Sequence, residues 1–199
     1  SMPKKSLATR SSSDARPEFR PLADRLRPHE LGEMVGQEKV IGKGAFVHEL
    51  IERNEVTSLI FWGPPGCGKT TLARIIAASG DYHFVEISAV TAGKADVMHV
   101  IEDARAMQRL GTRTILFVDE IHRFNKAQQD AFLPHIENGT IILIGATTEN
   151  PSFEVITPLL SRSRVIVLEG LDHKELVTIL KRATKLYPQL KVQAKALDA

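Results

Sequence analysis

The chain has 199 residues, of which 43% are hydrophobic and 25% are charged, a balance typical of a folded domain rather than a disordered or fibrous chain. Its 26 basic and 24 acidic residues leave a formal charge of +2, so overall charge indicates neither a nucleic-acid partner nor a membrane partner. The single cysteine, Cys67, excludes an internal disulfide framework and a cysteine-cluster zinc site. No apolar run approaches the ~18 residues of a membrane span, so we expect no membrane partner.

The first 20 residues are rich in serine, lysine and arginine and show no apolar periodicity. Five of them are basic and two are acidic. This composition predicts a flexible, basic and solvated tail over residues 1–20. A patch that contacts DNA is the alternative interpretation of the same charges.

Residues 21–170 have the pattern of an α/β domain, in which short apolar runs alternate with stretches of helical composition. The apolar runs are too short for buried helices, and near-continuous apolar strands predict a mainly parallel sheet that helices cover on both faces. In such sheets, ligands bind beyond the carboxyl ends of the strands. We expect strands over 58–62, 84–87, 114–118, 140–146 and 165–168, and helices over 43–53, 69–79, 95–109 and 126–137.

Residues 171–199 begin with an amphipathic helical pattern, for which Asp172 is a suitable N-cap and Pro188 marks the end. Eleven residues follow Pro188, too few to complete a helical unit. We therefore expect the sequence to stop inside a second, helical domain.

The clearest chemical signal is GPPGCGKT over residues 63–70, which satisfies the phosphate-loop pattern G-x-x-x-x-G-K-[ST] between a predicted strand and a predicted helix. Glycines let backbone N–H groups turn inward, and the helix N-terminus adds positive potential at the same place. Lys69 would reach the β- and γ-phosphates of a nucleotide, and the Thr70 hydroxyl would bind Mg²⁺. A glycine-rich turn with a surface lysine is the structural alternative.

Two carboxylates follow the strand predicted over 114–118. We assign Asp119 to the Mg²⁺ ion and Glu120 to the water that attacks the γ-phosphate. Without the phosphate loop, this pair would more often be a helix N-cap. With His122 it also gives the D-E-x-H pattern of many helicases, but only 77 residues follow His122, too few for the second nucleotide-clamping domain of those enzymes.

Three stretches carry a family resemblance: WGPPGCGKTT at 62–71, FVDEIHRFNK at 117–126 and IGATTENPSF at 144–153. They resemble the AAA+ ATPases, and within them the clamp-loader-like group typified by replication-associated recombination protein A and the Werner-helicase-interacting ATPase. The resemblance covers residues 21–171. It implies a P-loop core with a parallel five-stranded sheet sandwiched by helices, followed by the start of a helical lid.

The resemblance also implies roles for single residues. Thr148 matches the polar sensor of the γ-phosphate or the attacking water, with Thr147 as the neighbour that could be confused with it. Arg162 matches an arginine that reaches the γ-phosphate of the next subunit, whereas two plain surface arginines, with Arg164 paired to a local carboxylate, are the alternative. The nucleotide contacts it implies are Val35, Gly36, Gly63, Pro64, Pro65, Gly66, Cys67, Gly68, Lys69, Thr70 and Thr71.

Residues 122–125 offer base-stacking and phosphate-contacting groups next to the two carboxylates. A buried Phe124 and an Arg123 that contacts another subunit are equally good interpretations. Cys67 lies near a helix N-terminus that could lower the pKa of its thiol, although a threonine-like filler is the simpler interpretation.

The function that the resemblance implies is a Mg²⁺-dependent ATPase that acts on DNA at stalled or gapped replication forks. Implied partners are forked, gapped or single-stranded DNA, further copies of the chain in a tetramer or ring, and single-strand-binding or other replication proteins. The location would be the cytoplasm, at the nucleoid, in bacteria and the nucleus in eukaryotes. Alternatives are a clamp-loader subunit, a Holliday-junction branch-migration motor, or a nucleotide-gated interaction module without turnover.

Overall fold

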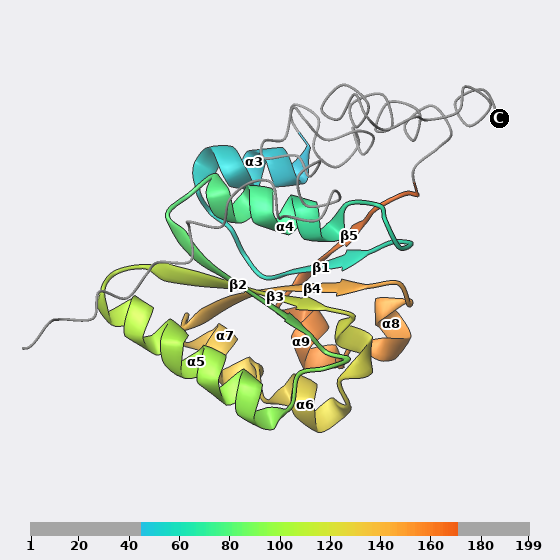
Figure 1. Cartoon of the computed structure of the whole chain (residues 1–199). Helices are drawn as coiled ribbons and strands as arrows, with labels where there is room; N and C mark the ends of the chain where they lie inside the picture. The colour runs from blue at the N-terminus through green and yellow to red at the C-terminus, as the bar shows by residue number, and fades with distance from the viewer. Residues whose placement is uncertain (1–44, 171–199) are drawn as a thin grey trace, which may run out of the picture.

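A computed structural model describes residues 45–170 of the chain, and these residues form a five-stranded parallel sheet. The strand order is β2-β3-β4-β1-β5, so β1 and β4 occupy the middle of the sheet (Figure 1). All four strand pairs are parallel, which requires a crossover between successive strands. The strands are β1 (Leu59–Trp62), β2 (Tyr82–Ser88), β3 (Arg113–Asp119), β4 (Ile141–Thr147) and β5 (Arg164–Val167).

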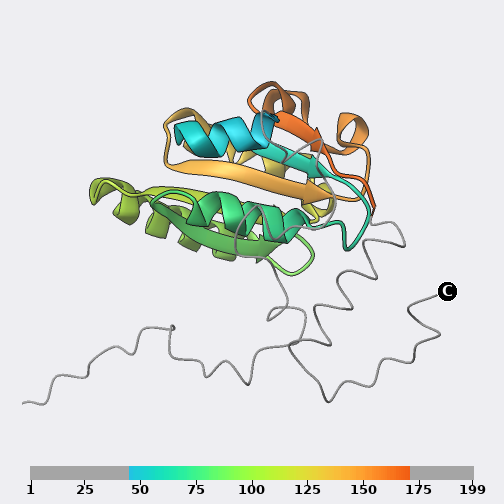
Figure 2. The ribbon, with the colours of Figure 1, turned by 90° about the horizontal axis from the view of Figure 1, so that it is seen from above.

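Helices cover both faces of this sheet (Figure 1). On one face lie α3 (Phe46–Arg53) and α4 (Lys69–Ala78). The other face carries α5 (Lys94–Arg109), α6 (Lys126–Asp130), α7 (Leu133–Glu137) and α9 (Thr157–Ser161). Two short elements, η3 (Ile121–Arg123) and α8 (Pro151–Glu154), lie near the carboxyl ends of β3 and β4. Figure 2 shows the strand arrows pointing the same way between these layers.

The alternation of side chains along the strands explains the two helical layers. Phe61 and Phe117 pack in the cluster that includes α3 and α4, whereas their neighbours Ile60 and Leu116 pack in the cluster on the α5 side. All four side chains are fully buried. Because burial of each such side chain contributes about 1.5–3 kcal/mol, strands that are apolar on both faces can only be stable between two layers of helices. The predicted three-layer α/β fold is confirmed.

The prediction of one helix over 126–137 was wrong. The structure has two short helices instead, with a turn at Ala131 and Phe132 and with Pro134 in the first turn of α7. Proline lacks an N–H donor and disfavours helical backbone in the residue before it, so it starts a helix more readily than it continues one. β2 is also longer than predicted, because Tyr82 and His83 pair in register with Arg113 and Thr114 of β3.

Several predictions fall outside residues 45–170. These are the basic tail over 1–20, the adenine-side residues Val35 and Gly36, and the helical unit over 171–199. Within the described part of the chain, no helix combines the length and the apolar character needed to cross a bilayer.

Candidate nucleotide site

The backbone of the loop between β1 and α4 adopts a conformation that requires glycine at several positions. Gly66 and Gly68 have φ angles of 75° and 97°, in the left-handed region that a side chain would strain. A Cβ on Gly63 would lie 2.4 Å from the carbonyl oxygen of Leu168, so this residue tolerates no side chain. The Gly63 N–H also donates to the carbonyl of Thr147, at 3.1 Å, which ties the loop to the end of β4.

Lys69 lies inside this loop rather than on the surface, and only 9% of it is exposed. Its Nζ donates to the carbonyl oxygens of Gly63 and Pro64, at 2.6 Å and 2.8 Å, and lies 3.6 Å from the Sγ of Cys67. A buried ammonium surrounded by loop backbone at a helix N-terminus is suited to bind an anion. The alternative of a surface lysine on a plain turn is therefore wrong for Lys69.

The two acidic residues predicted for catalysis lie at the carboxyl end of β3. Burial raises the pKa of the Asp119 carboxyl, and the nearby Glu120 and Glu86 carboxylates raise it further. A hydrogen bond from the Glu120 N–H and the positive charge of Lys69 lower this pKa, but they do not cancel the effect of burial. Asp119 thus lies within electrostatic reach of Lys69 although 50 residues separate them in the sequence. A cation next to Asp119 would relieve the repulsion among the carboxylates.

Glu120 has a left-handed backbone, with φ 51° and ψ 48°, and it immediately precedes η3. For a residue with a Cβ this conformation costs about 1 kcal/mol or more, so the surrounding contacts must hold it. The Glu120 N–H donates to the Asp119 Oδ1 at 3.0 Å, and its carbonyl accepts from the Arg123 N–H at 2.8 Å. Strained residues of this kind occur often at active sites.

Side chains alone do not form a closed metal site within residues 45–170, where no group of three or more His, Cys, Asp or Glu side chains converges. This fits Mg²⁺ in a phosphate-loop site, where the ion takes one or two protein oxygens and completes its shell with phosphate oxygens and water. Two groups could supply the protein oxygens for such an ion: the Thr70 hydroxyl in the first turn of α4 and the Asp119 carboxylate. The donor chemistry of the site therefore fits magnesium.

The two threonines at the end of β4 have different environments. Thr147 is buried, and its Oγ1 lies 2.9 Å from the Nδ1 of His122 and accepts from the Glu149 N–H at 3.0 Å. Thr148 follows the strand and is half-buried. Thr147 is thus engaged in joining β4 to η3, which leaves Thr148 as the better candidate for the γ-phosphate sensor. The contact with His122 was not predicted from the sequence.

Gln129 is a second residue that the sequence analysis missed. It is 2% exposed on α6, and its amide connects three segments. Nε2 donates to the carbonyls of Phe124 and Glu154, at 3.0 Å and 2.9 Å, and Oε1 accepts from the Ile156 N–H at 2.9 Å. No local sequence signal could have identified it, because its partners Glu154 and Ile156 lie 25 and 27 residues away in the sequence.

Arg162 caps the C-terminus of α9, and its guanidinium makes two contacts within the chain. Nη2 lies 2.6 Å from the Glu137 Oε1, and Nη1 donates to the Pro158 carbonyl at 2.9 Å. The guanidinium of Arg164 instead lies over the ring of Phe46, 4.2 Å from its centroid. The arginine that pairs with a local carboxylate is therefore Arg162 rather than Arg164. Both side chains of the Arg162–Glu137 pair are 40% exposed or more.

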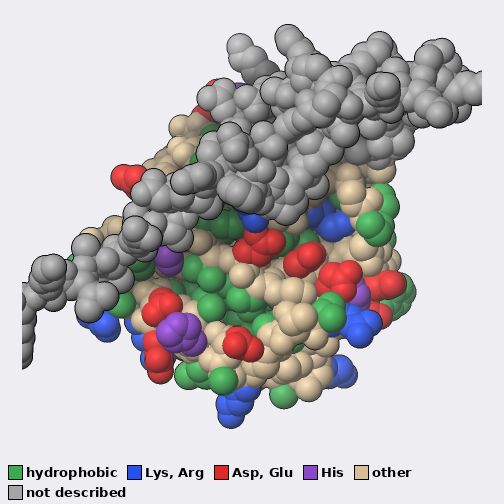
Figure 3. All heavy atoms as spheres, in the orientation of Figure 1, with side chains coloured by type: hydrophobic (Ala, Val, Ile, Leu, Met, Phe, Trp, Pro, Cys, Tyr) green, Lys and Arg blue, Asp and Glu red, His purple; other side chains and the backbone are tan. Residues whose placement is uncertain are grey.

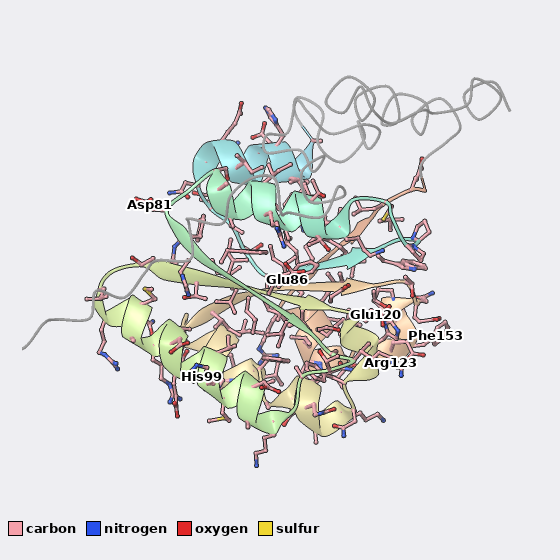
Figure 4. All side chains as sticks on the ribbon, viewed as in Figure 1. Asp81, Glu86, His99, Glu120, Arg123 and Phe153 are labelled. Carbon is pink, nitrogen blue, oxygen red and sulfur yellow. The ribbon has the colours of Figure 1, made fainter. Side chains whose placement is uncertain are left out.

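The segment 122–125 is divided between core and surface. Phe124 is 2% exposed and packs against Phe132, with ring centroids 5.9 Å apart. The interpretation of Phe124 as a buried residue is therefore confirmed, and the base-stacking alternative is wrong. Arg123 is exposed, as is Phe153 on α8, which is 84% accessible. Figure 4 shows Glu120, Arg123 and Phe153 at one end of the sheet and Asp81 at the other. On the face seen in Figure 3, acidic and basic side chains are interspersed where they are not covered by the grey residues.

Comparison with known proteins identifies the family of the chain. The model of the ATPase family associated with various cellular activities matches residues 59–171, from β1 to the end of the described sheet. The chain belongs to the AAA family of ATPases. It is 52% identical over 165 residues to replication-associated recombination protein A of Escherichia coli K12, covering 83% of this chain and 37% of that protein. It is 49% identical over 172 residues to ATPase WRNIP1 of Dictyostelium discoideum, covering 86% of this chain and 20% of that protein.

A solved structure has the same fold. The Thermotoga maritima RuvB Holliday junction branch migration motor superposes with a TM-score of 0.66 at 35% identity, over 82% of this chain and 55% of that one. The resemblance inferred from the three sequence stretches is thus confirmed at the level of the family. The chain spans little more than a third of the length of the replication-associated recombination proteins it matches.

Proposed function

We propose that this AAA domain binds ATP with Mg²⁺ and hydrolyses it. The observation that carries this proposal is the buried Lys69 in the loop over 63–70, whose Nζ is held by the Gly63 and Pro64 carbonyls. Its charge also lowers the pKa of Asp119 at the end of β3, against the larger effect of burial. Lys69 would exchange its contacts with the Gly63 and Pro64 carbonyls for phosphate oxygens of the nucleotide. The loop N–H groups and the first turn of α4, including Thr70 and Thr71, would hold the remaining phosphate oxygens.

Glu120 would orient and polarise the attacking water. Its backbone is fixed by the bonds to Asp119 and Arg123, so the carboxylate projects from a rigid turn rather than from a mobile loop. Asp119 and Thr70 would hold Mg²⁺, which when bound neutralises charge on the phosphates. Thr148 would then contact the γ-phosphate or the water from the end of the neighbouring strand β4.

Arg162 would act on the nucleotide of a neighbouring subunit. A guanidinium at that place stabilises the charge that spreads over the equatorial oxygens in the transition state. Its present partner, Glu137, does not prevent this, because an ion pair as exposed as this one is worth about 0.2–1 kcal/mol and a phosphate can displace it. The proposal therefore requires an oligomer, in which Arg162 moves from Glu137 to the partner's nucleotide.

The substrate on which this ATPase works is proposed to be DNA during replication and recombination, at stalled or gapped forks. Support comes from the relatives named replication-associated recombination protein A, which are 51–55% identical to this chain in three bacteria. Replication proteins such as a single-strand-binding protein would be its partners, in the cytoplasm of a bacterium or the nucleus of a eukaryote.

A branch-migration motor is the second candidate. It is favoured by the structural match to RuvB, a Holliday junction branch migration motor. The higher identity to the replication-associated recombination proteins places it second. A binding module without turnover is disfavoured, since such a module needs neither Glu120 nor Arg162.

Two variants of the full-length protein test nucleotide binding. Lys69→Ala should abolish binding of a fluorescent ATP analogue, because it removes the cation at the centre of the loop. Lys94→Ala is the matched control: Lys94 is an exposed lysine at the start of α5, outside the site, and its loss should leave binding unchanged. ATP affinity that survives in Lys69→Ala would refute the proposed site.

A mixing experiment tests Arg162. Subunits with Arg162→Ala and subunits with Lys69→Ala should each be inactive when pure. Mixed, the intact arginine of the second kind should restore hydrolysis at the intact sites of the first kind. Full activity of Arg162→Ala alone would remove the role of Arg162 in a neighbouring site.

A further inference from the structure

Gln129 lies between the two parts of the chain that contain the proposed catalytic residues Glu120 and Arg162. The carbonyl that it binds at Phe124 belongs to the residue that caps the C-terminus of η3, and η3 follows Glu120 directly. The N–H that it binds at Ile156 belongs to the residue that caps the N-terminus of α9, and Arg162 caps the other end of that helix. One buried side chain thus joins the element next to Glu120 to the helix that carries Arg162.

These hydrogen bonds use the whole amide. Both Nε2 protons have carbonyl acceptors and Oε1 has an N–H donor, with distances between 2.9 Å and 3.0 Å. Because the side chain is 2% exposed, water does not replace a bond that is lost, and each unsatisfied group would cost about 1–3 kcal/mol. η3, α8 and α9 are therefore held in one fixed arrangement.

The apolar contacts in this region do not impose the same restriction. Phe124, Phe132 and Leu159 are buried in one cluster, but apolar packing is non-directional and tolerates small sliding movements. The hydrogen bonds of Gln129 are directional and fix the position of Ile156 relative to Phe124. Since α9 has only five residues, a displacement at Ile156 is carried along a rigid helix of about 7.5 Å to Arg162.

We propose that Gln129 is a positioning residue that couples two sites of the same subunit. One is the nucleotide site at Glu120, and the other is Arg162, which acts on the nucleotide of the neighbouring subunit. This inference rests on the proposed function, in which Arg162 acts on the next subunit's nucleotide. A change at Glu120 on ATP binding moves η3, Gln129 transmits the movement to α9, and the guanidinium of Arg162 shifts between Glu137 and the neighbouring phosphate. The role differs from that of a purely structural hydrogen bond, which would stabilise the fold without linking the two sites.

The test uses mixed oligomers of the full-length protein. Acceptor subunits carry Arg162→Ala and keep an intact nucleotide site. Donor subunits keep Arg162 and carry either Glu120→Gln, which holds ATP, or Lys69→Ala, which holds none. In equal mixtures, phosphate release reports ATP hydrolysis at acceptor sites that lie next to the Arg162 of a donor. The ratio of the phosphate-release rates with the two kinds of donor measures how strongly the nucleotide bound to a donor controls the action of its own Arg162.

We expect this ratio to differ from one by about fivefold or more, the lower end of ordinary allosteric coupling. Gln129→Met in the donor should bring the ratio close to one. Ile156→Pro is a second variant in case the methionine variant does not fold, since the φ of Ile156 is −62°, which proline adopts readily. Proline removes the N–H that Gln129 binds, and it also removes part of the side-chain packing of Ile156 on the buried cluster. It should also abolish the difference.

Gln128→Met is the matched control. Gln128 is the neighbouring residue on α6, and its Oε1 accepts from the Asn125 N–H. Its loss therefore weakens the start of the same helix, while the hydrogen bonds from Gln129 to Glu154 and Ile156 keep their donors and acceptors. It should leave the ratio as in the parent. A ratio that survives Gln129→Met, or a parent ratio of one, would overturn the coupling while hydrolysis across subunits stands. Mixtures without any phosphate release would instead overturn the proposed function, and the coupling with it.

Discussion

Gly145 occupies the centre of the sheet where a side chain has no room. It lies in β4, paired with Ile60 of β1 and Val118 of β3. A Cβ at this position would lie 2.9 Å from the Cδ1 of Ile121 and 3.0 Å from the Cδ1 of Ile60, and both isoleucines are fully buried. Overpacking of this kind costs about 1–3 kcal/mol, whereas the gain from a less flexible unfolded chain is about 0.4–1 kcal/mol. Gly145→Ala should therefore lower the free energy of unfolding by about 1–2 kcal/mol.

The same substitution should affect the site, because Ile121 directly follows Glu120. Its displacement would move the carboxylate, so in the full-length protein ATP turnover should fall more than ATP affinity does. Urea unfolding of the chain measures the stability, and Ile121→Val provides the control. Valine lacks the Cδ1 atom that collides, so the double variant should be about 1 kcal/mol more stable than the sum of the two single effects. Additive effects, or an unchanged stability in Gly145→Ala, would refute the close packing beneath β4.

Two further substitutions test the electrostatics and the local capping of the site. Burial raises the pKa of Asp119, so its ionised form destabilises the fold, and parent stability falls as pH rises from the ordinary value of 3.8 through the raised one. Asp119→Asn should have a higher free energy of unfolding than the parent near pH 7, and this difference should shrink as pH falls through that window. If urea unfolding gave the same difference between variant and parent at every pH, the result would contradict this prediction. Asn125→Ala should cost about 0.5–2 kcal/mol in thermal unfolding, since its Oδ1 caps α6 by accepting from the Gln128 N–H. No loss would show that this cap does not stabilise α6.

The fold could be predicted from the sequence because its determinants are local. Apolar runs such as 114–118 are buried on both faces, so their composition alone indicates a strand between two helical layers. The phosphate loop could be recognised because its function depends on residue types at fixed spacing. The helix over 126–137 was predicted wrongly, since its overall composition is helical and the effect of the single Pro134 was underestimated.

The contacts that join the site could not be predicted because they depend on tertiary packing. His122 meets Thr147 across 25 residues, and Gln129 meets Ile156 across 27. The pair of Arg162 with Glu137 joins α9 to α7, which are separated in the sequence by β4 and α8. Nothing in the local sequence distinguishes these polar side chains from exposed ones, and only the fold brings them together.

The central claim is that Glu120 activates water for ATP hydrolysis at the site built by Lys69 and Asp119. Phosphate release and ATP binding by full-length Glu120→Gln test it most directly. The glutamine keeps the shape of the side chain and removes its negative charge, so ATP binding should stay within about twofold of the parent while turnover falls by about 10²-fold or more. Hydrolysis at the parent rate would contradict the assignment of Glu120.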